Sequence, residues 1–172
     1  MSQVWYAVLV GLVAVERLGE LVVAKRNLAW SLARGGRETG FGHYPFMVVL
    51  HTGLLAGCLA EVWVADRPFT ALLGWPMLAL VIAAQALRWW CIRVLGRQWN
   101  TRIVVVPGLP LVTGGPYRLF RHPNYVAVVV EGFALPLVHG AWLTAAVFTA
   151  VNAGLLTVRI RAEDRALRSV DA

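Results

Sequence analysis

The stretch "YVAVVVEGFALPLVHGAWLTAAVFTAVNAGLLTV", residues 125–158, is apolar apart from a few polar side chains and is divided by the pair His139-Gly140. Its two halves are segments 125–138 and 141–158. At a rise of about 1.5 Å per residue, a helix of either length reaches most of the way across a hydrocarbon core about 30 Å thick. The polar pair is long enough only for a tight turn. The stretch therefore predicts a helical hairpin within a membrane.

Three further apolar segments precede the hairpin, at residues 4–23, 46–65 and 69–90. Each has about 20 residues, enough for a helix to cross a bilayer alone. Hydrophobic residues make up 59% of the 172-residue chain, and its mean hydropathy is +0.65. These values lie far above those of soluble proteins. We therefore expect one all-α integral membrane domain, residues 1–172, with five transmembrane helices.

The basic residues predict the orientation of this domain. All of the 16 lysines and arginines except Arg17 and Arg67 fall after the first segment, between the third and fourth, or after the fifth. They are Lys25, Arg26, Arg34, Arg37, Arg88, Arg93, Arg97, Arg102, Arg118, Arg121, Arg159, Arg161, Arg165 and Arg168. The positive-inside rule then predicts an inner (cytoplasmic) membrane protein with its N-terminus outside and its C-terminus in the cytoplasm. This topology also explains the net charge of +7, so we expect no nucleic-acid partner. Cys58 and Cys91 lie in separate apolar segments without metal-ligand spacing, and we expect no metal.

Only the predicted cytoplasmic side has loops long enough to hold a polar site. We expect residues 97–124 and 159–172 to form a pocket there with the hairpin, 125–158. Within the first loop, "TRIVVV" (101–106) predicts a short extended piece, and the Pro- and Gly-rich run after it predicts tight turns.

The corner "RHPNY", residues 121–125, predicts an anion site at a helix start. Pro123 suits the first helical turn, which puts His122 near the N-cap. The free N–H groups there favour an anion, and Arg121 and His122 add donors and charge. Tyr125 follows His122 by three residues, so both side chains can face one pocket. An arginine cluster that binds the headgroups of membrane lipid is the alternative interpretation.

Carboxylates inside apolar segments need a partner or a function, because a charge at mid-membrane costs about 3 kcal/mol or more. For Glu16 and Glu20, beside Arg17, we expect a helix–helix ion pair, and for Glu61 with Arg67 a pair at the rim. Glu131 lies two turns after the corner. It could hold a ribose, balance a cationic cofactor, contact a substrate or pair with another helix. Asn152 in the last apolar segment, with Glu163 and Asp164 just beyond it, could complete the pocket from the neighbouring helix.

At these residues the chain resembles the isoprenylcysteine carboxyl methyltransferase family of membrane enzymes. The resemblance rests on "GGPYRLFRHPNYVAVVVEG", the second apolar helix and "VRIRAEDRAL", and covers residues 89–167. In that family the "RHPxY" corner and an acidic pair bind S-adenosylmethionine. The resemblance thus implies a cofactor site, to which we assign Gly115, Tyr117, Arg121, His122, Pro123, Tyr125, Asn152 and Glu163. The second acidic position holds Asp164, a shorter side chain than the usual glutamate.

The upstream runs "ETGFGHYPFMVVLH" and "LRWWCIRVLGRQWNTRI" look like a bacterial branch of the family found with type III polyketide synthases. The resemblance implies methylation of an alkylpyrone or alkylresorcinol, a lipophilic small-molecule substrate. A phenol or enol needs a group that takes its proton. We assign this catalytic role first to His43 and then to Glu131, with Tyr44 and His51 as further candidates.

Three alternatives to this reaction follow from the sequence. The first alternative acceptor is the carboxylate of a prenylated cysteine, which needs no general base. The membrane carboxylates are also typical of a proton-coupled small-molecule transporter. A haem protein that uses His51 and His122 is disfavoured, because the two histidines are expected at different depths.

Overall fold

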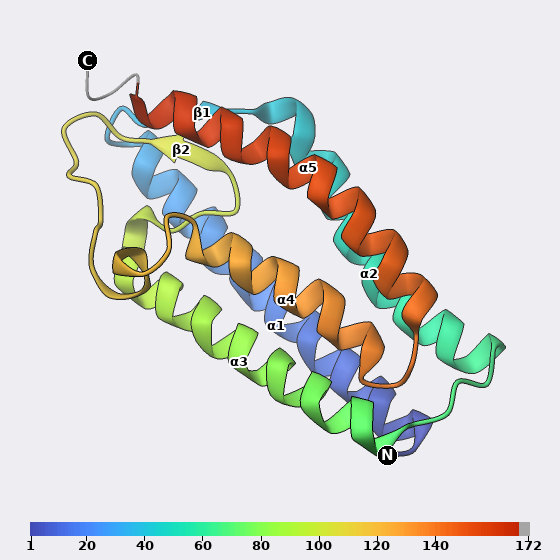
Figure 1. The fold of residues 1–172 in the computed structure, drawn as a ribbon. Helices are drawn as coiled ribbons and strands as arrows, with labels where there is room; N and C mark the ends of the chain where they lie inside the picture. Colours follow the sequence, from blue (N-terminus) through green and yellow to red (C-terminus); the bar gives the residue numbers. More distant parts are fainter. Residues whose placement is uncertain (169–172) are drawn as a thin grey trace.

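Four long α-helices and one shorter one, α4, lie along the described part of the chain (Figure 1). The computed structural model describes residues 1–168, so that part of the predicted pocket segment 159–172 lies outside the described residues. The helices are α1 (Gln3–Leu32), α2 (Tyr44–Val64), α3 (Ala71–Leu95), α4 (Pro123–Leu137) and α5 (Trp142–Arg168). Each of the five predicted apolar segments is thus helical. The hairpin is confirmed as well, because α4 and α5 are joined by a short turn and pack against each other.

By length and composition, three helices in the described chain can cross a membrane: Tyr44–Val64, Ala71–Gln98 and Trp142–Arg168. Although α1 has 30 residues, its apolar run is broken by Glu16, Arg17 and Glu20. With 15 residues, α4 is shorter than a typical span. The molecule is therefore a membrane protein with at least these apolar helices, and the five crossings stay a prediction.

Most of α4 is buried, because α3 packs on one side of it and α5 on the other. The α4–α5 contact is tightest at Gly132. A Cβ there would lie 1.9 Å from Cε1 of Phe148, so only glycine lets the two helices approach this closely. Around this contact Leu135, Tyr6 and Val62 form part of a continuous apolar core. The shortest helix is thereby held in the centre of the bundle.

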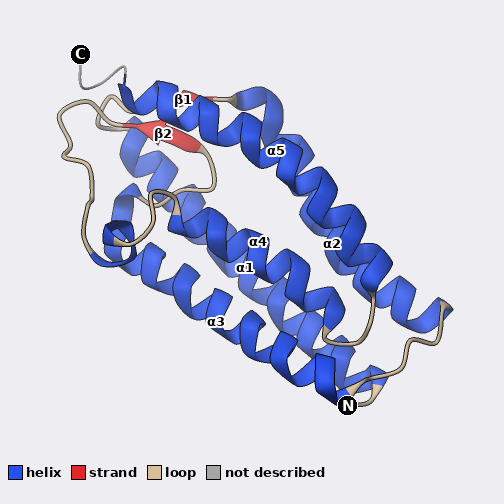
Figure 2. Cartoon of the chain, viewed as in Figure 1, coloured by secondary structure: helices blue, strands red, loops and turns tan. Residues whose placement is uncertain are grey.

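Two short strands interrupt the helical architecture (Figure 2). β1 (Arg37–Thr39) pairs antiparallel with β2 (Ile103–Val105), with Arg37 opposite Val105 and Thr39 opposite Ile103. The extended piece predicted within "TRIVVV" is confirmed. The fold is not purely helical, however, because that piece finds a partner in the loop between α1 and α2. Pairing ties the two long loops together at one end of the bundle.

We call this end the ribbon end; it holds β1, β2, residues 96–122 and the end of α5. At the opposite end, Glu61 accepts hydrogen bonds from the backbone N–H of Leu143 and Thr144 and so caps the start of α5. Arg67 lies 3.0 Å from the same carboxylate, which confirms the predicted rim pair. This end is made of short turns, so the ribbon end is where the fold leaves room for a site.

Candidate functional site

Two adjoining cavities lie at the ribbon end, with volumes of about 110 Å³ and 400 Å³. Tyr117, His122 and Glu163 line both of them, which makes the cavities one continuous site. The walls come from the end of α3, the β2 loop, the start of α4 and the end of α5. Residues distant in the sequence thus meet at one place in the fold.

The start of α4 follows the prediction closely. Pro123 is the first residue of the helix and His122 its N-cap. The imidazole of His122 stacks on the ring of Tyr125, with 5.5 Å between ring centroids. His122, Pro123 and Tyr125 all line the smaller cavity. The corner therefore presents its side chains to one site, as the spacing predicts.

His122 faces the two acidic residues near the end of α5. Its Nδ1 lies 3.7 Å from Oε1 of Glu163, and its Nε2 lies 3.3 Å from Oδ1 of Asp164. The carboxylates of Glu163 and Asp164 raise the pKa of His122 above its usual range. The acidic pair and the corner thus form one charge-paired unit that favours the protonated imidazole.

Arg159 extends this unit across the fold. The Tyr125 hydroxyl donates a hydrogen bond to Oε2 of Glu163 and accepts one of 2.8 Å from Nε of Arg159. Nη2 of Arg159 donates at 2.6 Å to the backbone carbonyl of Thr101. Arg159 lies at the ribbon end with the other basic residues that follow the fifth apolar segment. Its side chain is buried and holds Tyr125 in place.

Gly115, Tyr117 and Arg121 occupy different parts of this region. Gly115 has a φ of +57°, and a Cβ there would lie 2.7 Å from Cγ2 of Val94. It thus lets the loop approach α3 and is not part of either cavity lining. Tyr117 lines both cavities, and burial raises the pKa of its hydroxyl. Arg121 is exposed and lines the larger cavity.

Asn152 and His43 lie outside the linings of both cavities. Asn152 is buried on α5, about two turns before Arg159. The ring of His43 packs over Gly40 at the start of α2. Burial and the charge of Arg159 lower the pKa of His43, which keeps it neutral as a general base must be. The roles assigned to these two residues stay predictions.

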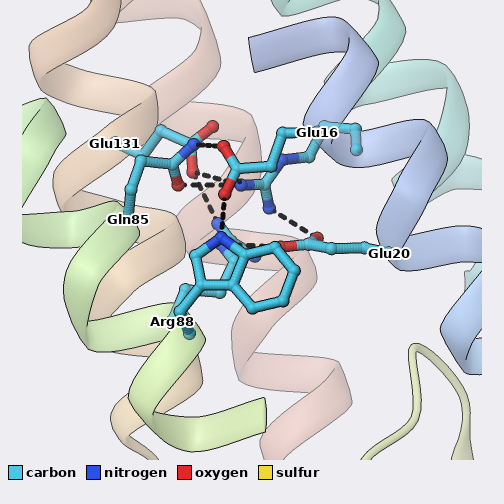
Figure 3. Close-up of polar contacts among 7 residues, drawn as sticks. Glu16, Glu20, Gln85, Arg88 and Glu131 are labelled. Atoms are coloured by element: carbon cyan, nitrogen blue, oxygen red, sulfur yellow. Dashed lines mark hydrogen bonds and ion pairs between the residues drawn. The ribbon is translucent and has the colours of Figure 1, made fainter. Parts of the chain in front are cut away.

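Glu131 pairs with neighbouring helices (Figure 3). Its Oε2 lies 2.6 Å from Nη2 of Arg88 on α3 and 3.5 Å from Nη2 of Arg17 on α1. Arg17 also binds Glu20 at 2.7 Å within α1, and Glu20 forms the predicted helix–helix ion pair with Arg88 of α3 at 3.7 Å. Arg88 was counted with the basic cluster between the third and fourth apolar segments, but it lies within α3 and its guanidinium is buried. The catalytic role of Glu131 stays a prediction.

Two lining residues were missed by the sequence analysis. Nε1 of Trp99 and Oδ1 of Asn124 are buried at the smaller cavity without a hydrogen-bond partner among the described residues. Buried polar atoms are nearly always paired, so a bound molecule is the natural partner. Asn124 stands in the variable position of the corner. Trp99 is an aromatic residue in a polar loop, a pattern too common to single it out.

The C-terminal half of the chain matches a known protein family. The model described as "Isoprenylcysteine carboxyl methyltransferase (ICMT) family" covers residues 77–169. A relative from Bacillus subtilis (strain 168), "Uncharacterized protein YpbQ", is 39% identical over 161 residues, 93% of this chain and 95% of that protein. An uncharacterized protein of Haemophilus influenzae is 25% identical over 154 residues, 88% of either chain. No solved structure matches the chain.

Proposed function

The chain belongs to the isoprenylcysteine carboxyl methyltransferase family and is therefore a membrane methyltransferase, and we propose that it methylates an oxygen atom of a lipophilic acceptor. The methyl donor in this proposal is S-adenosylmethionine, which methyltransferases of this family generally use. We place the ribbon end in the cytoplasm, so that the cofactor enters from water and the acceptor from the bilayer.

The side chains at the ribbon end fit this cofactor chemically. Arg121 and His122 can bind its carboxylate beside the free N–H groups of the first turn of α4. Glu163 and Asp164 add the negative charge that a positively charged ligand needs. Trp99 Nε1 and Asn124 Oδ1 offer an unused donor and acceptor. When bound, the cofactor supplies an activated methyl group.

For the acceptor we propose an alkylpyrone or alkylresorcinol, and a functional link to a type III polyketide synthase. This choice rests on the resemblance of the segments around His43 and Arg88 to a polyketide-associated branch. The carboxylate of a prenylated cysteine is the second candidate, because it is the acceptor that the family's description names. Either acceptor carries a long apolar chain that suits entry from the membrane. A proton-coupled transporter does not account for the family match and is the weaker alternative.

The observation that carries the proposal is the meeting of His122, Tyr125 and Glu163 at one cavity. The test is to incubate the protein in lipid nanodiscs with methyl-labelled S-adenosylmethionine and a panel of acceptors. The panel contains an alkylpyrone, an alkylresorcinol and a farnesylated cysteine. We expect label in the polyketide products. Label only in the farnesylated cysteine would overturn the acceptor, and label in none would contradict the reaction.

A further inference from the structure

A second polar group lies deeper in the bundle than the cofactor cavities. Figure 3 shows it between α1, α3 and α4, and we call it the central cluster. Its members are Glu16, Arg17, Glu20, Gln85, Arg88, Trp89 and Glu131. Gln85 and Trp89 both donate hydrogen bonds to the carboxylate of Glu16. Such a group is expensive within a membrane protein and therefore usually marks a function.

The central cluster carries more negative than positive charge. Its carboxylates are those of Glu16, Glu20 and Glu131, whereas its cations are the guanidiniums of Arg17 and Arg88. A guanidinium stays protonated in proteins. The cluster thus holds one carboxylate more than its cations can balance. The facing titratable side chain of α2 is His51, whose Nδ1 lies 2.8 Å from the Met47 carbonyl oxygen.

Both guanidiniums are already engaged. Arg88 binds Glu131 at 2.6 Å, and Arg17 binds Glu20 at 2.7 Å. A carboxylate acceptor needs a free guanidinium or similar donor, because an unpaired buried anion is costly. Here a carboxylate acceptor would instead meet the central cluster, which already carries excess negative charge. An uncharged hydroxyl compound meets no such repulsion.

One carboxylate oxygen of the central cluster has no hydrogen-bond partner among the described residues. Glu20 is only 3% exposed, yet its Oε1 accepts no hydrogen bond from any described residue. The nearest cation is Nε of Arg88 at 3.7 Å, which also donates none. This buried acceptor has the chemistry to receive a hydroxyl proton.

The cavities and the central cluster both lie against α3 and α4. The Tyr117 side chain, at the wall of both cavities, lies beside the Cys91 thiol. Cys91 lies one turn after Arg88 on α3. On α4, Glu131 follows Tyr125 by six residues, which is less than two turns. The cluster is thus the polar group toward which an acceptor from the apolar interior would point its hydroxyl.

We propose that the central cluster selects an uncharged phenol or enol as the acceptor and that Glu20 takes its proton. This inference rests on the proposed function. In the reaction the acceptor oxygen forms a bond to the methyl carbon while the sulfur–methyl bond of S-adenosylmethionine breaks. The hydroxyl proton passes to the Glu20 carboxylate, and the thioether S-adenosylhomocysteine leaves uncharged. Arg88 and Glu131 position Glu20 and act as positioning residues.

The first test measures acceptor binding by the wild-type protein in nanodiscs without cofactor, through quenching of tryptophan fluorescence. The ligands are an alkylresorcinol, N-acetyl farnesylcysteine and the methyl ester of the latter, which differs from it only by lacking the charge. We expect the alkylresorcinol and the ester to bind at least tenfold more tightly than the free acid. Equal or tighter binding of the free acid would overturn the inference.

The second test uses Glu20→Gln, with Asp66→Asn at the opposite end of the bundle as the matched control. We expect Glu20→Gln to lower methyl transfer to the alkylresorcinol about a hundredfold or more while cofactor binding is unchanged. A nitro-substituted resorcinol, which ionises without help, should recover most of the rate. An equal loss with both acceptors would assign Glu20 a structural role and contradict the inference.

Together with the acceptor panel, these tests distinguish a failure of this inference from a failure of the proposed methyltransferase function. If the protein binds S-adenosylmethionine and methylates only the farnesylated acid, the inference fails and the methyltransferase stands. If it neither binds the cofactor nor labels any acceptor, the proposed function fails, and the inference fails with it. Because the first test needs no variant, misfolding of Glu20→Gln would leave the proposal falsifiable.

Discussion

At the residue scale, each side chain of the cofactor site is held by another. His122 stacks on Tyr125, Tyr125 binds Glu163, and Arg159 binds Tyr125 from the far side. Because Arg159 also binds the Thr101 carbonyl, the β2 loop is fixed relative to α4 and α5. This chain of contacts orients the corner before any ligand binds, which lowers the entropy cost of binding.

Tyr125→Phe tests this chain, since it removes one hydroxyl and keeps the stacked ring. Glu163 and Arg159 each lose a hydrogen bond, and a buried group left without a partner costs about 1–3 kcal/mol. We expect the dissociation constant for S-adenosylmethionine to rise about tenfold, because about 1.4 kcal/mol corresponds to a factor of ten. Equilibrium binding of the labelled cofactor measures it. Tyr44→Phe, whose side chain lines neither cavity, is the control, and an unchanged constant for Tyr125→Phe would refute the assignment.

The neighbouring carboxylate of Glu163 makes the charge of His122 depend on pH in the folded protein. Its folded-state pKa is raised, so His122 contributes stability that is full below the unfolded pKa of about 6.5 and is lost as pH rises through the folded pKa. We expect the Tm of the wild type to exceed that of His122→Gln by more at pH 5.5 than at pH 9. Groups remote from His122 titrate alike in both proteins, so the difference isolates His122 and its pairing with Glu163 and Asp164. A difference that does not vary with pH would contradict this contact.

The sequence predicts this site only where local spacing determines geometry. Pro123 determines where α4 begins, and the three-residue spacing brings His122 and Tyr125 to one cavity. The burial of Arg88 and Arg159 could not be predicted, because an arginine near the end of an apolar run gives the same pattern whether it is buried or exposed. Only packing against α4 decides that they are buried.

At the element scale, the α4–α5 hairpin depends on a small residue. Gly132→Ala would place a Cβ 1.9 Å from the Phe148 ring, and overpacking of this kind costs about 1–3 kcal/mol. We expect a lower Tm for this variant in detergent. Gly154→Ala on α5 is the matched control, because nothing lies within 4 Å of its Cβ position and alanine favours a helix.

The paired strands show the limit of local patterns at this scale. The β-branched run "TRIVVV" predicts β2, whereas β1 contains Arg37, Glu38 and Thr39 and has no strand signal. Its strand conformation comes from the partner, with Arg102 and Glu38 joined at 2.9 Å beside the pair.

The hairpin contact, in comparison, is local. If Phe148→Leu, added to Gly132→Ala, restores the Tm of the protein, the loss of stability comes from this one contact between Gly132 and Phe148.

At the scale of the whole molecule, the distribution of arginines predicts which end faces the cytoplasm. We expect a cysteine at Ala65, an exposed residue at the turn end, to react with a membrane-impermeant maleimide added outside the cell. A cysteine at Arg118, exposed at the ribbon end, should react only after permeabilisation. Cys58 and Cys91 are buried and give little background. The reverse pattern would invert the orientation.

The central claim is that the ribbon-end cavities bind S-adenosylmethionine through the corner and Glu163. Equilibrium binding of the labelled cofactor to the purified protein in nanodiscs tests it most directly, with Glu163→Gln beside the wild type and Asp66→Asn, at the opposite end of the bundle, as the control. The account predicts saturable binding by the wild type and the control, and binding at least tenfold weaker for Glu163→Gln. Absence of binding by the wild type, or equal binding by all three proteins, would contradict it.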